Sequence, residues 1–239
     1  MKKLIIQQPR YLPVISYIQR LYFADIFVFL DNVQRQRLGV ENRNKIFINR
    51  KVEWLTIPVS SSTKEKIYKS KIHNLEWVAK HKRVIKEAYK KHPFFSEEII
   101  ELYYRDIENV LQKSDFNYSD TIIHLVKNCC DIFDIKPKYI KATELNVPEV
   151  KGLENLFNIA KAVNADVYIS GSNGRTYGVK EYFEQRGIKV LFHDPPIIKY
   201  KQYNTDDFIP WLCFFDTVFN LGVEKTKEFI YQIPDLKEN

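Results

Sequence analysis

Cysteine, glycine and long apolar runs are scarce in this chain, and the scarcity excludes several classes of protein. The 239 residues include three cysteines, Cys129, Cys130 and Cys213. An odd number without a CxxC spacing excludes a disulfide framework and gives no zinc signature. No apolar run approaches the roughly 18–20 residues of a membrane span, and the Leu-Ile-Ile after two N-terminal lysines is too short for a signal peptide. We therefore expect a cytoplasmic protein without a membrane span.

The apolar and charged residues that are present predict a folded protein with an anionic partner. Hydrophobic residues make up 45% of the chain and aromatic residues 14%, which excludes a disordered protein. The net charge of +7 favours phosphates, nucleotides, nucleic acid or an anionic membrane surface as partners. Many lysines fall between residues 64 and 91, where a solvated helix face is the alternative to an RNA-binding surface.

Short apolar runs alternate with amphipathic helical patterns at both ends of the chain. Strands are expected at 4–6, 26–30, 139–140, 166–169 and 189–192, a hairpin at 45–48 and 54–59, and helices at 15–23, 153–163 and 179–186. The middle is helical, with one buried stripe running from Ile99 to Leu111. This order predicts an α/β fold with a mostly parallel sheet flanked by helices and a helical insertion. We expect residues 1–71 to form the first part of the α/β domain, 72–135 the insertion and 136–239 the second part.

The first predicted strand is followed at once by a polar segment, Gln7-Gln8-Pro9-Arg10-Tyr11-Leu12-Pro13. The two prolines prevent the segment from continuing as strand or helix. Ligands bind at the carboxyl ends of strands in parallel α/β sheets. Gln8, Arg10 and Tyr11 are therefore candidate substrate-binding residues, and a capped turn with incidental polar residues is the alternative.

A second polar segment, Ser170-Gly171-Ser172-Asn173-Gly174-Arg175-Thr176-Tyr177, lies between a predicted strand and a predicted helix. It contains two of only seven glycines in the chain. Its backbone N–H groups and its arginine predict an oxyanion-binding loop, although it matches neither GxGxxG nor a Walker loop. The candidate binding residues are Ser170, Gly171, Gly174, Arg175 and Tyr177.

A third polar cluster comprises Asp31 and the triplet Asn42-Arg43-Asn44. Asp31 ends a buried strand, from which carboxylates commonly face an α/β active site, so we predict a catalytic role for it. Asn42, Arg43 and Asn44 are predicted to bind sugar hydroxyls or phosphate, and Asx turns are the alternative.

His81 is the best general-base candidate among the histidines, because imidazole titrates near working pH. A packed core histidine is the alternative.

Several different short motifs follow one another along the chain. They are Gln8-Pro9 with Tyr11-Leu12-Pro13, Gln34 with Asn42-Arg43-Asn44, Trp54-Leu55-Thr56-Ile57-Pro58-Val59, Trp77 with Lys80-His81, Ser170-Gly171 with Gly174-Arg175 and Tyr177, Tyr200 with Gln202, and Asp216 with Asn220. Through them the chain resembles the WbqC-like protein family of bacteria from Leu4 to about Gly222. Where the family's first motif opens with histidine this chain has Gln7, which makes His81 more attractive as a base, and Cys213 stands where serine is expected.

The resemblance implies a transferase of bacterial surface-polysaccharide biosynthesis, of the O-antigen (lipopolysaccharide) type. Such an enzyme would move an acyl or aminoacyl group, glycyl among them, onto a nucleotide-linked amino sugar. Arg10, Arg43 and Arg175 are expected to converge at one cleft and bind phosphate or carboxylate. No metal site is expected, and the sequence leaves cofactors and homodimer formation open.

Two other functions stay open. The first strand, turn and helix are similar to those of nucleotidylyltransferase folds, which favours an ATP-using ligase or nucleotidyl transferase, although both histidines of their phosphate-binding turn are missing. The basic middle of the chain favours an RNA-binding or tRNA-binding module. An aminoacyl-tRNA donor would unite this function with the transferase.

Overall fold

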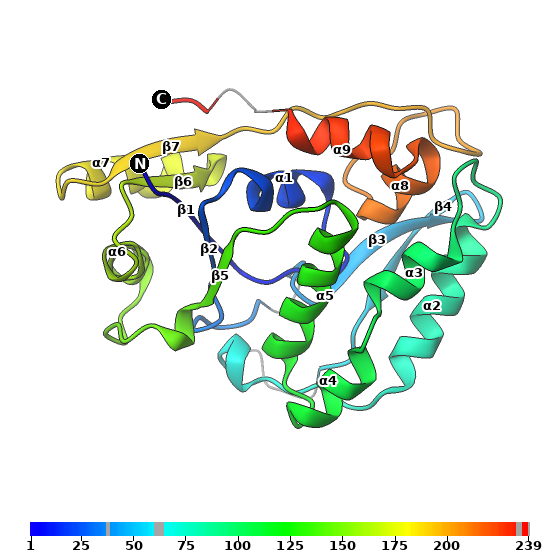
Figure 1. The fold of residues 1–239 in the computed structure, drawn as a ribbon, viewed down its shortest axis with the longest axis horizontal. Helices are drawn as coiled ribbons and strands as arrows, with labels where there is room; N and C mark the ends of the chain where they lie inside the picture. Colours follow the sequence, from blue (N-terminus) through cyan, green and yellow to red (C-terminus); the bar gives the residue numbers. More distant parts are fainter. Residues whose placement is uncertain (37–38, 60–64, 233–235, 239) are drawn as a thin grey trace.

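A five-stranded parallel sheet forms the centre of the protein, as the sequence predicts (Figure 1). The computed structural model describes residues 1–36, 39–59, 65–232 and 236–238. The strand order is β5 (Lys138–Lys141), β2 (Ile26–Phe29), β1 (Lys3–Gln7), β6 (Val167–Gly171) and β7 (Lys189–His193). A separate antiparallel hairpin consists of β3 (Arg43–Ile48) and β4 (Lys51–Thr56). The predicted α/β fold is confirmed.

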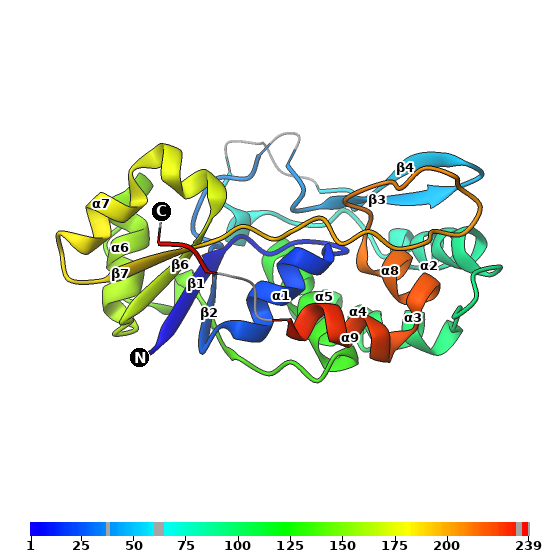
Figure 2. The ribbon, with the colours of Figure 1, turned by 90° about the horizontal axis from the view of Figure 1, so that it is seen from above.

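Helices cover both faces of the sheet, because the central strand is apolar on both sides. Ile5 of β1 belongs to a core cluster shared with α1 (Ile15–Phe23), α5 (Tyr118–Ile132) and α9 (Val223–Tyr231). Its neighbours Leu4 and Ile6 belong to a second cluster, shared with α6 (Gly152–Ala162) and α7 (Val179–Glu184). Figure 2 shows α6 and α7 on one side of the sheet and α1 and α9 on the other. The run Leu4-Ile5-Ile6 is thereby buried between two helical layers.

The helical middle of the chain comprises α2 (Glu76–Tyr89), α3 (Glu97–Tyr103), α4 (Ile107–Lys113) and α5. The prediction of one helix with a stripe from Ile99 to Leu111 was wrong. Asp106 has a left-handed backbone with φ of 57°, which an α-helix does not accommodate, and the chain therefore divides into α3 and α4. These helices share the core cluster of Ile5, and the unit boundaries at residues 72 and 135 stay a prediction.

Successive strands are added to the sheet in one direction from β1 to β5 and in the opposite direction from β6 to β7. The connection through α1 places β2 on one side of β1, whereas the connection through α6 carries the chain from β5 past β2 and β1 to β6. The loops after β1 and β6 therefore leave the sheet in different directions. Such a switch point opens a crevice outside the carboxyl ends of the two strands.

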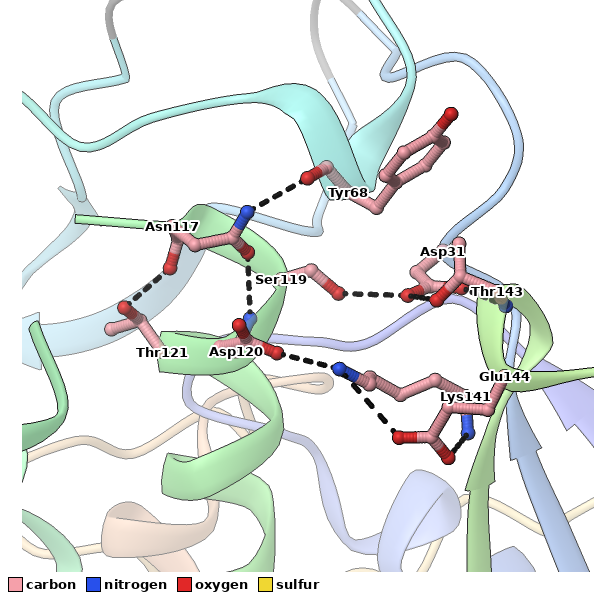
Figure 3. A network of polar contacts seen from close by, with 9 residues as sticks. All are labelled: Asp31, Tyr68, Asn117, Ser119, Asp120, Thr121, Lys141, Thr143 and Glu144. Atoms are coloured by element: carbon pink, nitrogen blue, oxygen red, sulfur yellow. Dashed lines mark hydrogen bonds and ion pairs between the residues drawn. The ribbon is translucent and has the colours of Figure 1, made fainter. Parts of the chain in front are cut away.

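A buried polar network closes the carboxyl end of β2 (Figure 3). Asp31 is 1% exposed and accepts hydrogen bonds from the Thr143 N–H (3.0 Å), the Thr143 hydroxyl (2.8 Å) and the Ser119 hydroxyl (3.3 Å). Lys141 extends the network by donating to Asp120 over 3.0 Å. Burial raises the pKa of Asp31 above its ordinary value. Asp31 thus joins β2 to the start of α5 and to the turn after β5.

A second buried carboxylate anchors the long strap of residues 194–213, which connects β7 to α8 (Phe214–Leu221) (Figure 2). Asp216 accepts hydrogen bonds from the Tyr200 hydroxyl (2.6 Å) and from Gln202 Nε2 (2.9 Å). Asn220 Oδ1 accepts from the Tyr203 N–H over 2.7 Å. Burial raises the pKa of Asp216 to about 6. These contacts fix the path of the strap along the molecule.

Replacing Asp31 with alanine removes a buried carboxylate that accepts three hydrogen bonds, so we expect the free energy of unfolding to fall by about 2–4 kcal/mol. Asp120→Ala is the control from the same network. Its side chain is 39% exposed, and we expect a loss below about 1 kcal/mol. Urea denaturation measures both, and an Asp31→Ala variant as stable as Asp120→Ala would contradict the structural role.

The raised pKa of Asp216 predicts a pH-dependent effect of Asp216→Asn. Since the folded pKa of about 6 exceeds the ordinary 3.8, the native state binds the proton more tightly, and wild-type stability falls as pH rises through this window. At about 1.4 kcal/mol per pKa unit, the stability deficit of the variant relative to wild type shrinks by about 2 kcal/mol between about pH 4.5 and pH 7.5. Denaturation at both pH values measures the difference, and an equal deficit at both would contradict it.

Candidate functional site

A large cleft of about 1140 Å³ lies at the switch point, outside the carboxyl ends of β1 and β6. Several separate parts of the chain contribute polar and aromatic residues to its lining. Among these residues are Gln7, Gln8 and Arg10 at the end of β1 and after it, Ser16, Tyr17 and Arg20 of α1, Gln34 and Gln36 after β2, Asn44, Lys45 and Trp54 of the hairpin, Asn155 of α6, the loop Ser170–Gly174 with Tyr177 after β6, and Trp211 of the strap. The position is the one at which open α/β sheets bind ligands.

Two partly buried arginines give the cleft its positive charge. The Arg10 guanidinium lies 5.7 Å from the centre of the Tyr17 ring. Arg20 donates through Nε to His193 Nδ1 (2.9 Å) and through Nη1 to Gln7 Oε1 (3.1 Å). Burial lowers the pKa of Arg10, and burial together with the nearby Arg10 charge lowers the pKa of Arg20 to about 10. Both side chains stay charged at neutral pH and are poorly hydrated, which suits binding of an anion.

The glycines of the loop after β6 are required by close packing. A Cβ atom on Gly171 would lie 3.2 Å from Arg20 Nη2, and one on Gly174 would lie 2.2 Å from Ser170 Oγ. The loop therefore approaches the arginine and folds tightly on itself because both residues lack side chains. This packing brings the backbone of the loop against Arg20 of α1 at the wall of the cleft.

Exposed aromatic side chains line the outer part of the cleft. Trp54 is 42% exposed, Trp211 44% and Tyr177 70%. The Arg43 guanidinium lies 4.4 Å from the centre of the Trp54 ring, and Lys45 Nζ lies 5.9 Å from it. Exposed tryptophans in a cleft offer flat apolar faces for the ring of a sugar or a base.

The structure brings together seven of the predicted site residues at this cleft: Gln8, Arg10, Asn44, Ser170, Gly171, Gly174 and Tyr177. Arg43 borders it through Trp54. Asn42 instead donates to the Ile57 carbonyl over 2.9 Å and so stabilises the hairpin. Asp31 lies in the closed network after β2 and does not line the cleft.

His81 and Tyr11 lie in the aromatic core, not in the cleft. The Tyr11 hydroxyl is 2.7 Å from His81 Nδ1 and also contacts the Tyr104 hydroxyl. The Trp77 ring packs edge-on against His81, 5.4 Å between centres. Burial lowers the pKa of His81 to about 4, so the imidazole is neutral at working pH. This is the packed core histidine that the sequence left as the alternative.

Arg175 is turned away from the cleft. Its guanidinium forms a two-pronged ion pair with Asp194, at 2.8 and 2.7 Å, and lies 4.2 Å from the centre of the Phe192 ring. The Asp194 carboxylate balances its positive charge. Of the three arginines expected to converge, Arg10 lines the cleft, Arg43 borders it and Arg175 lies against β7.

Sequence reasoning missed Arg20, Lys45 and Trp211 as candidate binding residues. A signal for Arg20 was present, because Ser16 and Arg20 lie four residues apart and share one face of the helix. They are two of three polar residues, with Gln19, in an otherwise apolar and aromatic helix of nine residues, and they mark a face that meets a polar site. Trp211 had no local signal, because the strap brings it to the hairpin through tertiary contacts.

The charged residues among the described lining are all basic: Arg10, Arg20 and Lys45. In the described part of the chain, no group of three or more histidine, cysteine, aspartate or glutamate residues is arranged to bind a metal ion. No helix within the same residues is long and apolar enough to cross a membrane. The cleft is therefore a basic, aromatic-lined site without an evident metal centre in its described part.

Comparison with known proteins agrees with the resemblance seen in the sequence. A Mycobacterium tuberculosis (strain ATCC 25618 / H37Rv) protein named "Uncharacterized protein Rv1507c" is 27% identical over 228 residues, covering 94% of this chain and 96% of the relative. No solved structure matches the chain. The WbqC-like protein family matches residues 8–228, a range that includes all the described cleft residues except those on β1. The chain belongs to the WbqC-like protein family.

Proposed function

We propose that this protein is a transferase of bacterial surface-polysaccharide biosynthesis, of the O-antigen type, that moves an acyl or aminoacyl group, with glycyl as one candidate, onto a nucleotide-linked amino sugar. The supporting observation is one cleft in which two partly buried arginines and a glycine loop face two exposed tryptophans. An anionic group and a flat ring on the same ligand match these two halves of the site. A nucleotide-linked sugar carries both.

The inner half of the cleft suits the phosphates. Arg10 and Arg20 supply guanidinium donors in a setting with little water, where hydrogen bonds to phosphate oxygens are strongest. The loop from Ser170 to Gly174 supplies backbone polar groups at the same wall. The outer half, with the exposed Trp54 and Trp211, suits the sugar ring, and a sugar bound there would have its amino group accessible to solvent and to the acyl donor.

The charge of the cleft also favours the chemistry of transfer. The sugar amine must be neutral to attack the acyl carbon, because an ammonium group has no lone pair. Basic neighbours such as Lys45 and Arg10 lower the pKa of an ammonium group bound beside them, which raises the fraction of neutral amine. In the transfer the C–N bond forms, the bond to the leaving group breaks, and the amine proton passes to that leaving group. Positive charge in the cleft stabilises the intermediate oxyanion.

The two alternative functions differ in their support. An ATP-using ligase or nucleotidyl transferase would use the same arginines, so only ligand binding separates it from the proposed transferase. The RNA-binding function relies on the lysines of α2 and its C-cap, but three of them are paired with glutamates: Lys82 with Glu101, Lys86 with Glu97 and the C-cap Lys90 with Glu87. This pairing reduces the positive charge that the helix offers to a nucleic acid.

Arg20→Ala should weaken binding of a nucleoside diphosphate-linked amino sugar about 100-fold, because a charge-assisted contact to phosphate is lost. Arg186→Ala is the matched control, since this arginine lies over the Tyr182 ring, 3.9 Å from its centre, outside the cleft lining. Calorimetry against such sugars, Mg-ATP, acyl-coenzyme A and tRNA measures binding. Binding of Mg-ATP or tRNA alone, or equal affinity for Arg20→Ala and wild type, would contradict the proposal.

The same ligand should change tryptophan fluorescence. The chain has three tryptophans, of which Trp77 is buried and the other two are at the cleft. A ligand ring stacked on Trp54 or Trp211 should shift or quench emission, and Trp54→Phe with Trp211→Phe should abolish the change while the Trp77 signal stays constant. A signal that persists in the double variant would place the ligand elsewhere.

A further inference from the structure

Two adjacent residues at the carboxyl end of β7, His193 and Asp194, each accept hydrogen bonds from an arginine. Asp194 balances the positive charge of its arginine, whereas His193 does not. Asp194 accepts two hydrogen bonds from Arg175 and balances its charge. His193 accepts one from Arg20 Nε over 2.9 Å. Of these two arginines, Arg20 is among the residues that line the cleft and Arg175 is not. The arginine whose charge is cancelled lies outside the cleft, and the one inside it is bound by an imidazole.

Both acceptors of Arg20 are neutral groups. Gln7 Oε1 is an amide oxygen, 3.1 Å from Arg20 Nη1. His193 is fully buried, and burial together with the Arg20 charge lowers its pKa to about 4. Because the guanidinium Nε–H is always a donor, His193 Nδ1 must be the unprotonated nitrogen of a neutral ring. Arg20 is thus oriented by neutral acceptors, and the Asp194 carboxylate, whose charge also acts to raise the pKa of Arg20, accepts its hydrogen bonds from Arg175 instead.

The remaining donors of Arg20 point to its ligand. A guanidinium has five N–H donors, and among the residues that the structure describes His193 and Gln7 accept two of them, which leaves three. Nη2 lies against the position where a Gly171 Cβ would be, at 3.2 Å, so the glycine keeps the space beside it open. The Arg10 charge is close enough to lower the Arg20 pKa. Two neighbouring cations with free donors match a ligand with two adjacent anionic groups.

We infer that His193 and Gln7 are positioning residues that orient Arg20 through neutral acceptors, so that its full charge is available to a diphosphate. The inference rests on the proposed function for the identity of the ligand's anionic part. A carboxylate at either position would orient Arg20 equally well but would cancel the charge. The Gln7 amide and the His193 imidazole therefore orient the Arg20 guanidinium without neutralising its charge.

Gln7→Glu tests the role of neutrality with a nearly isosteric change. Titration of the purified protein with inorganic pyrophosphate should show affinity about 10- to 100-fold weaker than wild type, while the melting temperature stays equal or rises. The control is Gln112→Glu, the same change at an exposed position of α4. Equal pyrophosphate affinity in Gln7→Glu and Gln112→Glu would overturn the inference.

Variants of His193 test whether the orientation of Arg20 matters separately from its charge. His193→Asn keeps a neutral acceptor and should retain most of the pyrophosphate affinity, whereas His193→Leu should lose about 10-fold. In an Arg20→Ala background, His193→Leu should cause no further loss, because His193 acts only through Arg20. A full further loss there would overturn the inference. Pyrophosphate binding is read without any transfer reaction, so failure of the proposed transferase activity leaves this result intact and distinguishable.

Discussion

The cleft depends on the strand order around β1, where successive strands are added to the sheet first on one side and then on the other. β1 lies between β2 and β6, and the connections on its two sides run in opposite directions along the sheet. The loops after β1 and β6 consequently separate instead of packing together, and the space between them becomes the cleft. The hairpin and the strap extend this space outward, because Asp216 and its partners fix the strap that carries Trp211.

The arginines in and around the cleft differ in the groups that contact their positive charge. Arg175 is paired with a carboxylate, and Arg43 lies over an indole ring. Arg10 and Arg20 lie in the cleft, where burial lowers their pKa values. A desolvated cation that is oriented but not neutralised is costly in the free protein and gains most from an anionic ligand. This arrangement is the reason why we propose a phosphate-bearing ligand rather than a neutral sugar alone.

Much of the fold was predictable because its signals are local. The apolar run of β1, the helix at 15–23 and the strand at 26–29 each have their own periodicity, and their order implies a parallel sheet. Gln8, Arg10 and the loop from Ser170 were identified because polar residues directly after strands meet at one edge. The break at Asp106 had no such signal, because the stripe of apolar residues continues across it.

The predicted site residues that lie outside the cleft are held there by contacts between distant residues. Asp31 resembles a catalytic carboxylate until Thr143, 112 residues away, is seen to donate to it. His81 likewise has its partner Tyr11 70 residues away. Arg20 was overlooked because its acceptor His193 lies 173 residues further along the chain. Local sequence shows which side chains can do chemistry, whereas tertiary contacts decide which of them are already satisfied.

A crystal structure of the protein with a bound nucleoside diphosphate-linked amino sugar tests the central claim most directly. The account predicts that the phosphates lie within hydrogen-bond distance of Arg10 and Arg20 and that the sugar packs against Trp54 or Trp211. Phosphates bound in the groove formed by Arg50, Lys91 and Lys201, with the switch-point cleft left to solvent, would contradict it.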